Sequence, residues 1–170
     1  MKMETLQDLF EIELRYAYDC EQKLVKKGLP TMIEACSSSE LRQGLEQHLR
    51  ETQNQVSRLE RVFGIVGAEP ETDSNDIFDK MSSAVKDSIS HTEDGSSVRD
   101  AALVVNGNQV EHYEMAVYGS LVSFAQHLGF QEAATLLQQT LDEEKAADEK
   151  LTEIGESLIN PQAAQDRPAA

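Results

Sequence analysis

The sequence predicts an all-α protein, a four-helix bundle built from two helical hairpins. Apolar residues recur at steps of three and four along four long stretches, which is the spacing of helices that pack along one side. Only four of the 170 residues are proline, so these stretches are free to be helical. The length fits one domain with a single core, which we expect over residues 1–160, followed by a disordered tail over residues 161–170.

The first predicted hairpin covers residues 4–66. Its first helix extends from about residue 4 to residue 35 and contains Pro30, which we expect either to kink the helix or to end it early. The serines at residues 37–39 interrupt the apolar pattern and supply an N-cap for the second helix. That helix then extends to about residue 66, and Gly67 is expected to end it.

The second predicted hairpin consists of helices over residues 96–128 and 130–159, with Gly129 between them. Residues 67–95 form a long crossover between the hairpins, and within it an amphipathic pattern predicts a short extra helix over residues 77–89. A single crossover of this kind joins two hairpins in one class of four-helix bundle. The prolines and alanines that follow Asn160 predict the disordered tail.

The composition excludes several classes of partner. The formal net charge is −16, which argues against DNA, RNA and anionic membranes, because binding to polyanions requires lysine and arginine. No apolar run approaches the roughly 20 residues of a membrane span. The two cysteines form no CxxC motif, and the N-terminus becomes acidic within its first residues, unlike a signal peptide. We therefore expect a cytoplasmic location.

Four glutamates form two matched pairs. Glu21 and Glu51 are equidistant from the first predicted turn, and Glu114 and Glu144 are equidistant from the second. Helical residues that are equidistant from a tight turn lie at the same height in the hairpin. Carboxylates that converge inside a bundle would repel one another and lose hydration, so their placement predicts a bound cation.

The helical stripes indicate which acidic groups face the interior. Glu21, Glu114 and Glu144 fall on the apolar stripes of their helices, whereas Glu51 lies at the margin of its stripe. Three further candidate ligands lie one helical turn from one of these glutamates, namely Glu111, His48 and Asp148. Carboxylates with imidazole suit iron, manganese or zinc, and glutamates can bridge two ions. Taken alone, His48 is more typical of a hydrogen-bonded core histidine than of a ligand.

Other polar residues near these positions have structural interpretations. Tyr18 and Tyr118 lie near the predicted ligands, and we expect them to pack in the core while each hydroxyl bonds a carboxylate. Cys20 lies off the apolar stripe and is interpreted as a packing residue. His112 and His127 point away from the predicted site and are expected at the surface.

Four segments of the chain resemble the YciF-type bacterial stress proteins of the ferritin-like superfamily. The segments are Tyr18-x-x-Glu21, His48-Leu-Arg-Glu51-Thr52, the run VRDAALVVNGNQVEHYEMAVYGSL and the run LDEEKAADEKL. The resemblance covers the chain from Leu6 to about Ile159. It implies a ferritin-like four-helix bundle, a binuclear metal site usually taken as di-iron, a bacterial cytoplasmic protein, homodimers and an association with stress responses.

The chain departs from the usual ferritin-like pattern at two positions. Ferritin-like sites typically carry Glu-x-x-His on two helices. Here Asn54 follows Glu51 at that spacing, and Ala147 follows Glu144. The predicted site is therefore richer in carboxylate and poorer in imidazole than is usual for the superfamily.

The leading functional prediction is a binuclear non-haem protein, with two Fe or Mn ions per chain, that reacts with a small oxidant such as peroxide or dioxygen. Two alternatives remain open. An iron-storage protein would need a large closed shell, and a non-enzymatic stress module would act through protein contacts around a vestigial acidic cluster. The sequence identifies no catalytic residue.

Overall fold

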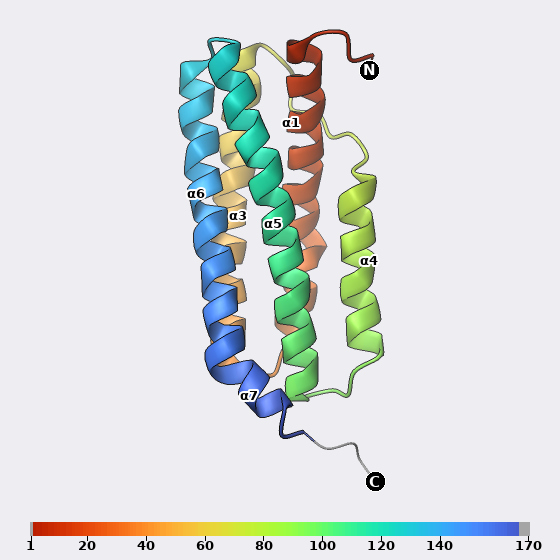
Figure 1. The fold of residues 1–170 in the computed structure, drawn as a ribbon. Coiled ribbons are helices and arrows are strands. Elements are labelled where there is room, and N and C mark those ends of the chain that lie inside the picture. The colour runs from red at the N-terminus through yellow and green to blue at the C-terminus, as the bar shows by residue number, and fades with distance from the viewer. Residues whose placement is uncertain (1, 167–170) are drawn as a thin grey trace.

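The computed structural model describes residues 2–166 and shows a bundle of long antiparallel helices (Figure 1). The bundle helices, in chain order, are α1 (Leu6–Lys23) with its continuation α2 (Leu29–Ala35), α3 (Ser39–Val66), α5 (Ser97–His127) and α6 (Gln131–Ile154). Helix α4 (Asp76–Ser90) lies outside the bundle, against α5. This arrangement confirms the predicted four-helix bundle and the short helix in its crossover.

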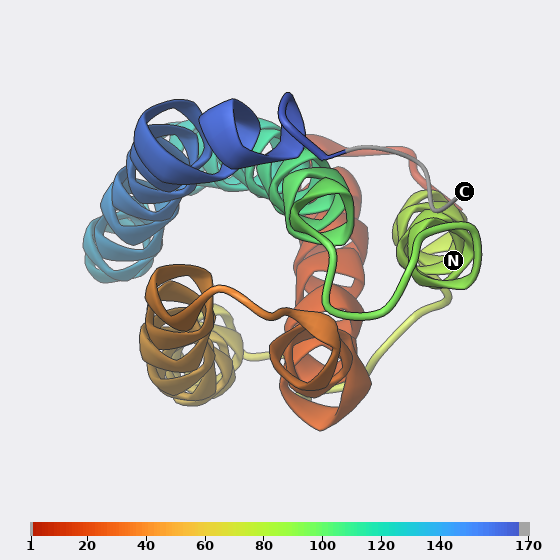
Figure 2. The same cartoon turned by 90° about the horizontal axis from the view of Figure 1, so that it is seen from below.

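The two hairpins pack face to face. Viewed from below, α1, α3, α6 and α5 follow one another around the bundle, so that α3 lies beside α6 and α1 beside α5 (Figure 2). Because each hairpin joins antiparallel neighbours, the middles of all four long helices meet at one level, halfway along the bundle. A residue in the middle of any of these helices can therefore approach the other three.

The predicted helix ends are confirmed at three positions. The side chain of Ser38 caps α3 by accepting a hydrogen bond from the backbone N–H of Leu41 at 3.2 Å. Gly67 and Gly129 follow α3 and α5 with φ values of 75° and 84°, a left-handed conformation that glycine adopts without strain. These caps fix where each hairpin turns.

Pro30 neither ends nor sharply interrupts the first helix. A π-helical segment, η1 (Leu24–Gly28), precedes it, in which the N–H of Leu29 bonds the carbonyl of Leu24. Pro30 then falls in the first turn of α2, the position at which helices best tolerate proline. A proline also follows the second π-helical segment, η2 (Gly155–Ile159).

The chain remains helical beyond residue 160, where the sequence predicted a disordered tail. Helix α7 (Asn160–Ala163) follows η2 and holds Pro161 in its first turn. The side chain of Asp166 then accepts a hydrogen bond from the backbone N–H of Ser97 at 3.1 Å, which ties this segment to the start of α5. The predicted tail therefore begins too early, and its residues 167–170 lie outside the described part of the chain.

The core consists of two apolar clusters with a polar layer between them. The cluster near the start of α1 contains fully buried residues such as Phe10, Leu14, Phe63 and Leu121, and the other contains Leu41, Leu45, Leu103 and Ile159. In the second cluster, a Cβ at Gly107 would lie 2.8 Å from Leu151, so glycine permits the close approach of α5 and α6. Within residues 2–166, no helix is both long and apolar enough to cross a membrane.

Candidate metal centre

The polar layer contains a group of buried side chains from all four long helices, which we call the carboxylate cluster. Its members are Glu21 on α1, His48 on α3, Glu111 and Glu114 on α5, and Glu144 on α6. One donor atom from each member other than Glu21 lies within 4.8 Å of the corresponding atoms of the rest. Glu21 is 0% exposed, and its charge acts on Glu114.

The helical period explains why these side chains face inward. On α3, the buried polar residues His48, Thr52 and Gln55 follow one another at steps of four and three, the period of a packed seam. On α5, Glu111 and Glu114 are one turn apart and both are 2% exposed. Each helix thus supplies its ligand candidates from the face that also carries the apolar core.

Neighbouring groups contact one atom of several cluster members. The Tyr118 hydroxyl donates to Oε1 of Glu21, and the Cys20 thiol donates to Oε1 of Glu114 at 3.6 Å. Nε2 of His48 lies 3.3 Å from Oε1 of Glu111. These contacts orient the side chains. They leave the second oxygen of each of these carboxylates, and Nδ1 of His48, without a bond.

The remaining donor atoms of the cluster are buried without a partner among residues 2–166. They are Oε2 of Glu21, Oε2 of Glu111, Oε2 of Glu114, both carboxylate oxygens of Glu144, and Nδ1 of His48. Buried polar atoms nearly always have hydrogen-bond partners, and leaving a charged one without a partner is costly. Every member of the carboxylate cluster therefore retains at least one atom that is free to bind a cation.

Burial changes the protonation of every member. Loss of hydration raises the pKa of Glu21, Glu111 and Glu114 well above the ordinary glutamate value, and the neighbouring carboxylates act in the same direction. Burial also raises the pKa of Glu144 to about 7 and lowers the pKa of His48 to about 4. His48 is therefore neutral at pH 7, which is the form that ligates metals.

The next residue on α6, Glu143, lies in a different environment. Two guanidinium nitrogens of Arg58 donate to its two oxygens, each at 2.8 Å, and Gln55 donates at 3.1 Å. Arg58 also donates to the hydroxyl of Thr140 at 2.6 Å. This bidentate pair fixes α3 against α6 beside the carboxylate cluster.

Two predicted ligands lie outside the carboxylate cluster. The side chain of Glu51 is 34% exposed and accepts a hydrogen bond from Gln47 at 2.9 Å, although its Oε2 lies 3.9 Å from Nδ1 of His48. Asp148 accepts a hydrogen bond from Asn108 at 2.6 Å and so faces α5. The structure thus brings together Glu21, His48, Glu111, Glu114 and Glu144 and leaves these two at the edge.

Some contacts of the site were not predicted from the sequence. Cys20 is 1% exposed and bonds Glu114, whereas it was interpreted as a packing residue off the apolar stripe. The hydroxyl of Tyr118 bonds a cluster carboxylate as predicted, but that of Tyr18 bonds Glu60 instead, at 2.9 Å. The step between adjacent helical residues is ~100°, so Cys20, next to Glu21, could have been expected to face the neighbouring helix.

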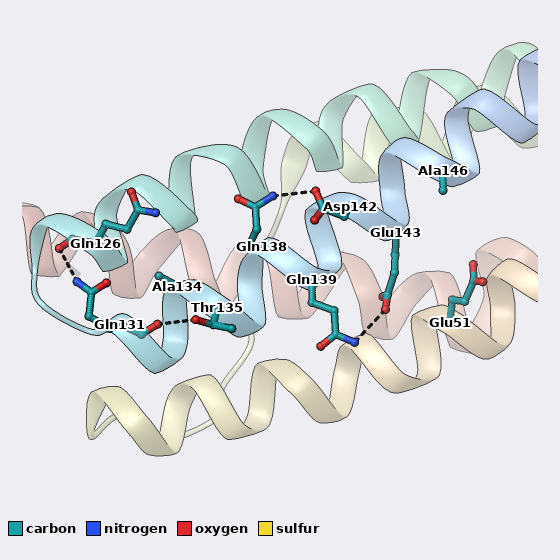
Figure 3. A pocket seen from close by; sticks show the side chains of 10 residues that line it. All are labelled: Glu51, Gln126, Gln131, Ala134, Thr135, Gln138, Gln139, Asp142, Glu143 and Ala146. Carbon is teal, nitrogen blue, oxygen red and sulfur yellow. Dashed lines mark hydrogen bonds between the residues drawn. The ribbon is translucent and has the colours of Figure 1, made fainter.

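Two hollows lie along the seam between α3 and α6, and Glu51 lines both. The larger measures about 650 Å³ and follows the outer side of α6, where Glu51 reaches from α3 toward Ala146 (Figure 3). The smaller measures about 180 Å³ and lies between the two helices. His48 lines this smaller hollow, so the carboxylate cluster borders it directly.

Comparisons with known proteins agree with the predicted resemblance. The model of a family described as a domain of unknown function, DUF892, matches residues 5–164. Protein YciF of Escherichia coli K12 is 35% identical over 96% of this chain and 98% of its own length. The crystal structure of that stress protein superposes with a TM-score of 0.88, at 35% identity, over 93% of this chain and 99% of its own.

Two other solved structures share the fold. YcfI from Rhodopseudomonas palustris is 39% identical and superposes with a TM-score of 0.85 over 89% of this chain and 95% of its own. A protein from Xanthomonas campestris, at 23% identity, superposes with a TM-score of 0.72 over 92% of this chain and 94% of its own, which supports the fold alone. These findings confirm the predicted YciF-type resemblance and the ferritin-like bundle.

Proposed function

The chain belongs to the DUF892 family, and we propose that it is a stress-associated ferritin-like protein that holds two redox-active metal ions, iron or manganese, in the carboxylate cluster. The similarity to the E. coli stress protein YciF supports the association with stress.

One observation carries this proposal. Six donor atoms of the cluster are buried without a partner among the described residues. Bound cations would give the carboxylate oxygens among these atoms partners and would offset the cost of burying charge. No residue of the cluster supplies a positive charge at pH 7, because the pKa of His48 is lowered to about 4.

The donor set fits two divalent ions of an iron or manganese type. Glu21, Glu111, Glu114 and Glu144 carry four negative charges when all are ionised, and two divalent ions would balance them. Oxygen donors with one imidazole suit iron, manganese and zinc better than soft metals. Glutamates from three different helices can each contact one ion or bridge two, as in other ferritin-like bundles.

When bound, iron or manganese would supply electron transfer to a small oxidant such as peroxide or dioxygen. The chain's own residues would prepare the site for this reaction. Tyr118 fixes the orientation of Glu21 through its hydroxyl, and the two apolar clusters exclude bulk water from both ends of the polar layer.

The assembly and location are also proposals. Val98 and Val105 lie two turns apart on one face of α5, at 45% and 55% exposure, and both could be covered in a homodimer. We propose a homodimeric cytoplasmic protein without nucleic-acid or membrane partners. Light scattering checks this, because an iron-storage shell would give a particle of many subunits and a dimer would exclude it.

Elemental analysis of protein purified without chelators tests the metal proposal. We expect about two Fe or Mn ions per chain in the wild type. Glu144→Gln is expected to lose metal, whereas Glu149→Gln, which alters an exposed glutamate of the same helix, is expected to keep it. A wild-type protein with only trace Fe, Mn and Zn would overturn the proposal.

The second candidate function is a non-enzymatic stress module, and the description of the Rhodopseudomonas relative as a candidate structural protein favours it. In that case the carboxylate cluster would be vestigial, and Glu144→Ala would raise the melting temperature even in the presence of metal ions. Loss of metal together with a lower melting temperature in this variant would exclude the second candidate.

A further inference from the structure

We propose that divalent cations reach the carboxylate cluster through the smaller hollow between α3 and α6, and that Glu51 receives them at its mouth instead of ligating them in the final site. This inference rests on the proposed function, since it concerns how the same site is loaded. It assigns a role to a hollow and a glutamate that lie outside the cluster itself.

Small side chains keep the hollow open. Gly44 lines it from α3, and Ala146 and Ala147 line it from α6. Ala147 occupies the position, three residues after Glu144, at which ferritin-like sites typically carry a histidine. A methyl group there leaves the approach to the cluster unfilled, with a volume of about 180 Å³.

His48 connects the hollow to the cluster. Its side chain is 8% exposed and lines the hollow, and its Nδ1 has no partner among residues 2–166. That nitrogen lies 3.9 Å from Oε2 of Glu51, while Nε2 on the other side of the ring lies 3.3 Å from Oε1 of Glu111. The three side chains thus form a continuous row of donor atoms from the half-buried Glu51 to the buried cluster.

The surroundings of Glu51 favour the capture of cations. The larger hollow beside it is also lined by Asp142, and the chain has a net charge of −16 (Figure 3). Acidic groups gathered at a concave surface raise the local concentration of cations. Lys150 also lines the smaller hollow, but its ammonium group is paired with Glu153 at 3.1 Å.

A third hollow, of about 470 Å³, supplies matched controls. It lies among α1, α4 and α5, and it is lined by Glu13 and Ala116 without any member of the carboxylate cluster. The variants Glu13→Gln and Ala116→Leu therefore repeat the chemistry of Glu51→Gln and Ala147→Leu at a site that the inference does not involve.

Stopped-flow absorption of Co²⁺ added to the metal-free full chain measures the rate of loading. We expect Glu51→Gln and Ala147→Leu each to slow uptake about tenfold, because one removes the capturing charge and the other fills the route. Both variants are expected to reach the wild-type Co²⁺ content at equilibrium, and both control variants to load at the wild-type rate. Circular dichroism checks that all variants are folded.

Two results would overturn the inference while leaving the proposed function intact. One is an unchanged rate of uptake in Ala147→Leu or in Glu51→Gln. The other is a lower final Co²⁺ content in Glu51→Gln, which would make Glu51 a ligand of the site. Failure of the wild type to bind any Co²⁺ would instead count against the proposed function itself.

A metal-free experiment tests the route separately. Diethyl pyrocarbonate is a small neutral reagent that modifies uncharged imidazole, and peptide mass spectrometry reports each histidine. We expect His48 to react through the hollow and to react more slowly in Ala147→Leu, because the larger side chain fills the route. The exposed His112 is the internal control. Lack of reaction at His48 in the wild type, or an equal rate in the variant, would contradict an open route.

Discussion

Glu143 and Glu144 are adjacent on α6, yet their environments differ completely. Glu143 accepts hydrogen bonds from Arg58 and Gln55, whereas neither oxygen of Glu144 has a partner among the described residues. Glu144 is also the more deeply buried of the two. The comparison indicates that hydrogen-bond partners, and not the degree of burial alone, separate a carboxylate with a structural role from one that is free to bind a cation.

The largest effect on stability is expected when the hydrogen-bonded pair of Arg58 and Glu143 is broken. Arg58→Ala removes both donors to Glu143 and the bond to Thr140, so we expect the free energy of unfolding to fall by roughly 3 kcal/mol. Urea denaturation measures this loss. Arg61→Ala is the control, because Arg61 is 64% exposed and its contact with Glu132 is long, at 3.8 Å. Equal effects of the two variants would show that the Arg58 pair is not structural.

The second-largest expected effect is a gain in stability. Glu144→Gln removes a buried charge that has no partner, so we expect the metal-free protein to become more stable by about 1–3 kcal/mol. When metal is added, the wild type should gain stability and the variant should not. Thermal unfolding with chelator and then with Mn²⁺ measures both changes. A Glu144→Gln protein that is less stable in chelator would contradict the contrast with Glu143.

The pH dependence of stability gives a further test of the difference between Glu143 and Glu144. The pKa of Glu144 rises from 4.5 to about 7 on burial, so between these values the folded protein keeps a proton that the unfolded chain releases. The stability of the metal-free protein should therefore fall as the pH rises from 4.5 to about 7, by about 1.4 kcal/mol per pH unit for each proton retained. Glu21, Glu111 and Glu114 act in the same direction.

His48 opposes this trend over part of the range. Its pKa falls from 6.5 to about 4 on burial, so its contribution to stability is lost as the pH falls through that interval. Because the carboxyl groups outnumber it, the net slope in chelator should remain negative above pH 4.5. Urea denaturation at pH 5 and pH 8 measures the slope, and Glu144→Gln should reduce it. A metal-free protein that is more stable at pH 8 than at pH 5 would contradict the account.

The smallest effect is expected at Asp148, a predicted ligand that lies at the edge of the carboxylate cluster. Asp148→Asn alters a contact with Asn108 but none of the cluster donors, so the free energy of unfolding should change by less than about 1 kcal/mol. Its metal content should match that of the wild type by elemental analysis. Loss of metal in this variant would extend the site to Asp148.

The fold and most of the site could be predicted because both follow the helical period. The stripes on α1, α5 and α6 placed Glu21, Glu114 and Glu144 inside, and the serine and glycine caps placed the turns. Glu51 was expected beside Glu21 because the two are equidistant from the first turn. That argument assumes uniform α-helix, whereas the π-helical segment η1 lies between Glu21 and the turn and changes the phase of the helix.

The central claim is that bound cations offset the charge of the carboxylate cluster. Crystals of protein prepared in air without chelators, with diffraction data collected at the iron and manganese absorption edges, test it most directly. We predict two anomalous peaks among Glu21, His48, Glu111, Glu114 and Glu144, within coordination distance of the unpaired carboxylate oxygens. A map without anomalous peaks in that layer, with the carboxylates bonded to ordered water or turned toward solvent, would contradict the account.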